Sequence, residues 1–121
     1  MSHDAYAQVL RNTANPRDTE YRAFATSTRA LLSAGEEDPK ALAEALHVNR
    51  SLWEALASDC ASDANGLPEE LRARIVGLAR FVVAHSKRVL RREETVDALV
   101  DINRIMMDGL TGNTGLDPNA A

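Results

Sequence analysis

Aromatic residues and cysteine are scarce in this sequence. Only 4% of its residues are Phe, Trp or Tyr, whereas Ala and Leu are common. Because aromatic residues favour strands and Ala and Leu favour helices, this composition predicts helices rather than sheets. The single cysteine, Cys60, has no second cysteine with which to form an internal disulfide. This low cysteine content is typical of a protein from a reducing compartment.

Long hydrophobic runs are also missing. No apolar run approaches the ~20 residues that a membrane-spanning helix needs, which argues against membrane insertion. The opening residues Ser2, His3 and Asp4 are polar and do not resemble the charged and then apolar leader of a secreted protein. We therefore expect a cytoplasmic protein.

The usual patterns of catalytic and metal-binding residues do not occur. The sequence has no glycine-rich phosphate loop, no nucleophile elbow and no pair of carboxylates in an apolar setting. His3, His47 and His85 are not spaced three or four residues apart, as two metal ligands on one helical face would be. The sequence therefore predicts no enzyme, no catalytic residue, no metal site and no cofactor.

The length and the hydrophobic content are those of one small domain. The chain has 121 residues, of which 45% are hydrophobic, so it can form one core but not two. Residues 111–121 contain Gly, Asn, Asp and Pro without any apolar period. We expect a single domain over residues 1–110 and a disordered tail over residues 111–121.

Helix start and stop signals divide the domain into five segments. A capping residue followed by proline occurs at Asn15-Pro16 and at Asp38-Pro39, and Pro68 opens a further segment. Gly35 is a typical helix end. The fold class predicted is all-α, a single small bundle of four main helices plus a short N-terminal helix. The predicted helices span residues 2–12, 16–34, 39–60, 68–92, and 93 or 94 to 110, with a loop over residues 61–67.

Each main helix carries an apolar stripe that is interrupted by a polar residue. Three of these residues, Thr28, Asn49 and Asn103, stand at the centres of their stripes, and His85 stands near one end of its own. In one interpretation they form a buried polar layer that fixes the register of the helices. In the other they form the floor of a groove that accepts a partner. The sequence leaves both open.

A basic segment is the most distinctive electrostatic feature. Between Arg72 and Arg92 lie seven of the fourteen basic residues and no acidic residue, although the net charge of the chain is −4. These cations spread over the side of the helix opposite its apolar stripe, where they could meet an acidic protein or RNA, or be neutralised by neighbouring helices. The candidate docking residues are Arg80, Lys87, Arg88, Arg91 and Arg92.

Two isoleucines fall outside the main stripe of the last helix. Ile102 and Ile105 lie about one turn apart, beside the charged Asp101 and Arg104. Either the short N-terminal helix or a partner covers this apolar pair. An uncovered pair beside charges would suit helix-in-groove binding.

Short blocks along residues 5–110 resemble a known family. The blocks are Ala5-Tyr6, Pro16-Arg17, Glu20-Tyr21-Arg22, Phe24, Asn49-Arg50, Leu52-Trp53, Leu56, Asp59-Cys60, Asn65, Leu67-Pro68, Leu71-Arg72, Asp101-Ile102-Asn103-Arg104-Ile105-Met106 and Gly109-Leu110. In this order they are similar to the flagellar biosynthesis regulator FlaF family of alphaproteobacteria. The resemblance brings no catalytic motif.

The resemblance implies a cytoplasmic protein that promotes flagellin synthesis and filament assembly alongside the regulator FlbT. Flagellin itself is then the expected partner, because a secretion chaperone would cover its amphipathic terminal helices before export. The expected partner-binding residues are Ile102, Ile105, Asp101, Arg104 and Arg50. An alternative is a post-transcriptional regulator of flagellin mRNA translation, acting with FlbT through the basic fourth helix. A third is an adaptor that only bridges other regulators.

Overall fold

The computed structural model describes residues 16–35, 38–62 and 66–111. These residues form four helices, α2 (Pro16–Ala34), α3 (Pro39–Ala61), α4 (Glu69–Leu90) and α5 (Asp97–Leu110), and no strand. The predicted all-helical fold with four main helices is confirmed. The short helix predicted over residues 2–12 lies outside the described residues, as does the predicted tail beyond Thr111.

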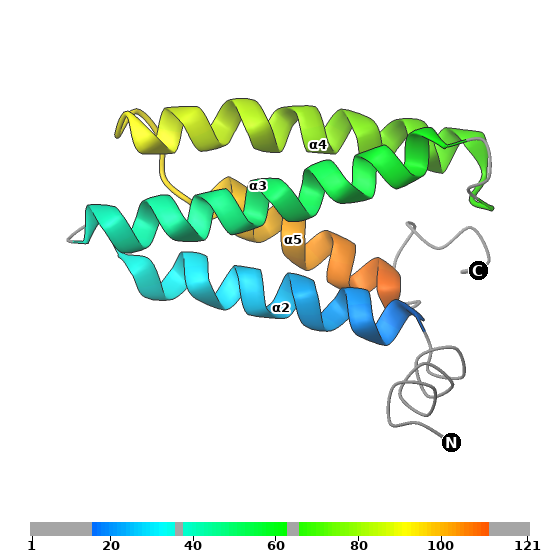
Figure 1. The fold of residues 1–121 in the computed structure, drawn as a ribbon, viewed down its shortest axis with the longest axis horizontal. Helices are drawn as coiled ribbons and strands as arrows, with labels where there is room; N and C mark the ends of the chain where they lie inside the picture. Colours follow the sequence, from blue (N-terminus) through cyan, green and yellow to red (C-terminus); the bar gives the residue numbers. More distant parts are fainter. Residues whose placement is uncertain (1–15, 36–37, 63–65, 112–121) are drawn as a thin grey trace, which may run out of the picture.

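The helices are arranged with α3 at the centre. Figure 1 shows α3 between α2 and α4, while α5 crosses behind α2 and α3. The long helix α4 packs mainly on α3, and α5 packs mainly on α2. One side of α4 is therefore left at the surface of the bundle.

At both ends of α3, side chains form hydrogen bonds with backbone groups. Asp38 caps its first turn, because the side-chain oxygen accepts a hydrogen bond of 3.1 Å from the backbone N–H of Ala41. At the other end, the Arg72 guanidinium donates to the carbonyl oxygens of Cys60 and Ser62 at 3.3 and 3.2 Å. A cation at these carbonyls also complements the negative end of the helix dipole. Arg72 thus ties the start of α4 to the end of α3.

The connection between α4 and α5 differs from the prediction. The sequence predicted a fourth helix to residue 92 and a last helix from residue 93 or 94, but α4 ends at Leu90 and α5 begins only at Asp97. Arg92 has a left-handed backbone with φ of 61°, which ends the helix. The N–H of Arg92 bonds to the carbonyl of Val89, and that of Glu93 to the carbonyl of Arg88. These two bonds form a Schellman motif, in which arginine replaces the usual glycine.

The core is centred on Trp53. This side chain is completely buried and meets Phe24 of α2 edge to face, with ring centroids 5.3 Å apart and planes inclined by 72°. Such edge-to-face contacts add to the stabilisation from burial itself. The same core cluster includes the buried apolar side chains Leu31, Leu46, Ile75, Val82, Val89, Leu99 and Met106.

Cys60 belongs to this core and is not a reactive surface thiol. Only 2% of the residue is exposed. Burial raises the pKa of the Cys60 thiol above its ordinary value, Asp59 and Glu20 raise it further, and Arg72 offsets part of the increase. The thiol therefore stays protonated where a free cysteine begins to ionise.

At about pH 8 we expect iodoacetamide to alkylate Cys60 at least about tenfold more slowly in the folded protein than in the chain unfolded in urea. The reason is that the thiolate is the reactive form. The native state holds this proton more tightly than the unfolded chain. Its contribution to stability is therefore complete below the ordinary thiol pKa and decreases as the pH rises above it. Equal alkylation rates in the folded and unfolded protein would contradict this description.

Candidate partner-binding surfaces

The two isoleucines of α5, which were expected to form one apolar pair, differ in exposure. Ile105 is 51% exposed, whereas Ile102 is half-buried and packs against the core. The charged neighbours Asp101 and Arg104 are both exposed. The described residues therefore leave one apolar side chain projecting from α5, beside a second that is anchored in the fold. The N-terminal segment that could cover them lies outside the described residues.

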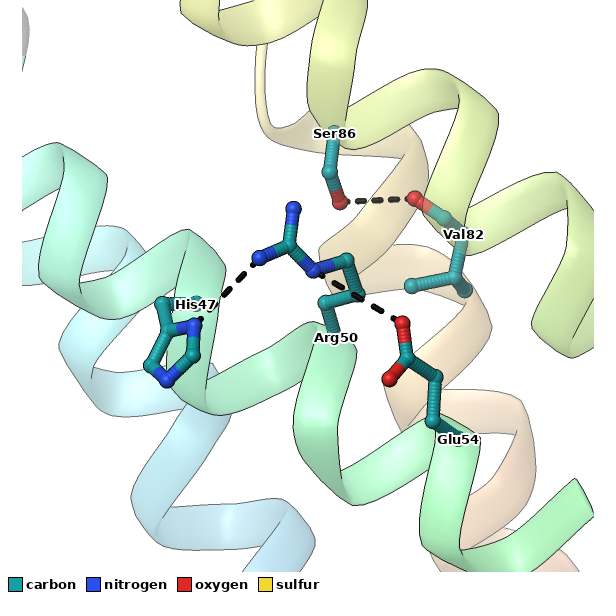
Figure 2. A network of polar contacts seen from close by, with 5 residues as sticks. All are labelled: His47, Arg50, Glu54, Val82 and Ser86. Atoms are coloured by element: carbon teal, nitrogen blue, oxygen red, sulfur yellow. Dashed lines mark hydrogen bonds and ion pairs between the residues drawn. The ribbon is translucent and has the colours of Figure 1, made fainter. Parts of the chain in front are cut away.

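Arg50 lies on another side of the molecule. Its Nε is 3.7 Å from the Glu54 carboxylate, and its guanidinium is 3.3 Å from His47 Nδ1. Figure 2 shows the Arg50 side chain between these two neighbours on α3, on the side that faces Val82 and Ser86 of α4. The structure thus places Arg50 at the α3–α4 side and not with the charged pair of α5. A partly exposed ion pair of this kind adds little stability.

The basic face of α4 is exposed. Arg80, Lys87 and Arg88 lie on α4, and Arg91 and Arg92 lie in the turn that follows it; all five are exposed. None of the five makes an ion pair with an acidic side chain of the described residues. Neutralisation by neighbouring helices, one of the alternatives that the sequence left open, is therefore not seen in this part of the chain.

A groove runs between α3 and α4 next to two of these cations. Its volume is about 520 Å³. Most of the residues that line it are small or apolar, and no residue of α2 or α5 is among them. The lining residues are Glu54, Ala57 and Ser58 of α3 and Val76, Ala79, Arg80, Val83, Ala84 and Lys87 of α4. The groove was not predicted from the sequence, because it forms only where residues of α3 and α4 meet in the folded chain.

A second pocket lies at the end of the bundle where α4 connects to α5. It has a volume of about 580 Å³ and is lined by Leu31 and Leu32 of α2, Leu42 of α3, Val89 of α4 and Val96 before α5, among others. It was not predicted from the sequence either, because its walls combine the end of α2, the start of α3 and the connection from α4 to α5, which meet only in the folded chain.

The polar residues at the centres of the stripes form a buried network. Asn103 is fully buried. Its amide nitrogen donates to Asn49 Oδ1 at 2.8 Å and to Thr28 Oγ1 at 3.1 Å. Its amide oxygen accepts a hydrogen bond from Trp53 Nε1 at 2.8 Å. Ser27, which lies outside the predicted stripe of its helix, donates to the same Asn49 oxygen at 2.8 Å. These residues are 0 to 7% exposed. The layer is therefore part of the core and not the floor of an open groove.

The indole of Trp53 determines how the side-chain amides of Asn103 and Asn49 are oriented. An indole N–H can only donate, so the atom of Asn103 that meets it must be the carbonyl oxygen. The amide nitrogen of Asn103 then faces Asn49, which must present its own oxygen. One consequence is that the buried amide nitrogen of Asn49 has no hydrogen-bond partner among the described residues. Each orientation follows from the one before it.

His85 does not join this layer, contrary to the grouping suggested by the sequence. Its Nε2 lies 3.0 Å from the carbonyl oxygen of Thr95, and its ring stacks on Phe81 with centroids 5.2 Å apart. His85 sits near the C-terminal end of α4, and the Thr95 carbonyl belongs to the connection between α4 and α5. It therefore anchors that connection.

Within the described residues, none of the four helices combines the length and apolar character required to span a bilayer. The same part of the chain contains no group of three or more His, Cys, Asp or Glu side chains arranged to hold a metal ion.

Comparison with known proteins identifies a family. Neither a curated protein nor a solved structure matches the chain. The family model described as flagellar protein FlaF matches residues 2–110, which is most of the chain. This family consists of flagellar proteins and is not a known enzyme family, and the match confirms the resemblance seen in the sequence blocks. The chain therefore belongs to the FlaF family of flagellar proteins.

Proposed function

We propose that this protein binds unassembled flagellin in the cytoplasm as a secretion chaperone and thereby promotes flagellin synthesis and filament assembly. Membership of the FlaF family supports a role in the flagellum. The terminal segments of flagellin are amphipathic helices that polymerise in the filament, so their apolar sides need cover before export. A small helical protein can supply that cover by helix-to-helix packing.

The observation that carries the proposal is the exposure of Ile105 on α5. Ile105 is about half exposed, whereas Ile102 packs against the core. The exposed charged residues Asp101 and Arg104 are their neighbours in the sequence. An apolar contact with a charged border is the usual anatomy of a protein interface. A helix of flagellin would bury Ile105 and meet one or both charges.

Replacing Ile102 and Ile105 together with Ala is expected to weaken flagellin binding by about tenfold, because the two side chains lose the methyl and methylene groups that binding would bury. Calorimetric titration with monomeric flagellin measures the change. The control is the double variant Leu32→Ala and Val48→Ala. These residues are 53% and 52% exposed, nearly the same as Ile105, but they lie on α2 and α3. If the α5 variant keeps its helical circular dichroism and binds flagellin with unchanged affinity, the assignment of this surface is wrong.

The exposed cations of α4 favour one alternative function, control of flagellin mRNA translation in concert with FlbT. Five cations without ion pairs in the described residues could contact phosphates. Direct RNA binding through them would lose affinity steeply as salt is added, because each neutralised phosphate releases counterions. A flat salt profile, or no RNA binding, would remove this alternative and leave flagellin binding or a purely bridging role.

A further inference from the structure

We propose that the groove between α3 and α4 docks an amphipathic helix of a protein partner, and that this helix carries acidic side chains beside its apolar face. This inference goes beyond the proposed function, because no residue of α5 lines the groove. A protein bound here would leave Ile105 free to contact flagellin.

The shape of the groove suits a helix. Its walls consist largely of small side chains, including Ala57 of α3 and Ala79 and Ala84 of α4, with the half-buried Val76 and Val83 between them. Small side chains let a third helix approach closely. The α4 residues of the groove extend from Val76 to Lys87, about three helical turns or roughly 16 Å. A helix of three or four turns would therefore fill the groove along its length.

The charges of the groove select an acidic occupant. Arg80 and Lys87 line it from α4, both are exposed, and neither has an ion-pair partner among the described residues. The one acid of the groove, Glu54, lies at the opposite wall and is already paired with Arg50 (Figure 2). The free charge of the groove is thus positive, although the whole chain is acidic. Complementary potentials of this kind fix the orientation of a partner and speed its association.

The apolar lining favours a protein helix over RNA as the occupant. A phosphate backbone gains nothing from contact with alanine and valine, and single-stranded bases need aromatic side chains to stack on. The exposed aromatic ring of α4, Phe81, does not line the groove, and it stacks on His85 instead. Of the two kinds of macromolecule that the cations of α4 could attract, only an amphipathic helix uses both the charges and the apolar walls.

The test uses the full chain and a fluorescein-labelled synthetic helical peptide with Leu and Ala on one face and Glu along its flanks. We expect saturable binding by fluorescence anisotropy. The double variant Arg80→Glu and Lys87→Glu should weaken it at least about tenfold. The variant Ala84→Tyr should weaken it to a similar extent, because Ala84 is exposed and a tyrosine there fills the groove without disturbing the core.

Two controls match these variants. The double variant Arg29→Glu and Arg74→Glu changes the net charge equally at exposed residues outside the groove, and it should bind the peptide within about twofold of the parent protein. A peptide with Lys in place of Glu should not bind. The groove variants should also keep their affinity for flagellin, so that failure here is distinguishable from failure of the proposed function.

Three results would overturn the inference. The first is absence of saturable binding of the Glu peptide. The second is equal weakening by the Arg29 and Arg74 control, which would show that only net charge matters. The third is binding of a single-stranded oligouridine that depends on Arg80 and Lys87 and is unaffected by Ala84→Tyr, which would mark the basic face as an RNA surface.

Discussion

Replacing Asn103 with Leu is expected to lower the free energy of unfolding by about 3 kcal/mol, although the two side chains have similar volumes. Asn103 is fully buried and links three helices through Trp53, Asn49 and Thr28. Without its amide oxygen the indole N–H of Trp53 is left buried with no acceptor, and without its amide nitrogen Asn49 loses one of two donors. Buried groups that lose their partners cost more than the bonds themselves contribute.

Urea unfolding monitored by circular dichroism measures this loss. The variant Thr28→Val is the comparison, because it removes one acceptor from Asn103, whose amide nitrogen keeps its bond to Asn49. It also removes the bond from the Thr28 hydroxyl to the Phe24 carbonyl. It should cost only about 1 kcal/mol. The exposed Asp101→Ala should change stability by less than about 0.5 kcal/mol. A loss below about 1 kcal/mol for Asn103→Leu would show that the network does not contribute as described.

Replacing Trp53 with Ala is expected to have an even larger effect, a loss of about 4 kcal/mol. The side chain is completely buried, contacts Phe24 edge to face and donates to Asn103. Alanine leaves a cavity in the centre of the core and breaks the hydrogen bond that orients the network. The same urea titration measures the change.

The variant Trp53→Phe separates the two contributions. Phenylalanine keeps most of the ring contact with Phe24 but has no N–H for the Asn103 oxygen. We expect it to be clearly more stable than Trp53→Ala. In combination with Asn103→Leu its effect should be less than additive, because both variants remove the same hydrogen bond. Strict additivity would contradict the direct Trp53–Asn103 contact.

The helices were predictable wherever their ends are marked by local chemistry. The capping residue and proline at Asp38-Pro39 identified the start of α3, and Gly35 marked the end of α2. The end of α4 was missed because the left-handed residue is Arg92, whereas such a residue is usually glycine. That conformation depends on the turn into α5, which a local pattern does not contain.

The burial of the central polar residues was predictable from the sequence, but their contacts were not. Periodicity placed Asn49 and Asn103 on core stripes, and both are buried. It could not show that Ser27 and Trp53 complete their network, because those contacts join residues 22 and 50 positions apart. The family resemblance named Arg50 as a partner-binding residue together with Asp101 and Arg104 of α5, whereas the Arg50 side chain lies on the side of α3 that faces α4 (Figure 2). Such groupings arise only once the helices are packed.

The measurement that tests the proposed function most directly is a calorimetric titration of the full chain with unassembled flagellin, repeated with flagellin that lacks one or the other terminal helix. We expect saturable binding to intact flagellin that disappears with one of the truncations and is weakened by the Ile102→Ala and Ile105→Ala pair. Absence of binding to intact, monomeric flagellin would contradict the chaperone function.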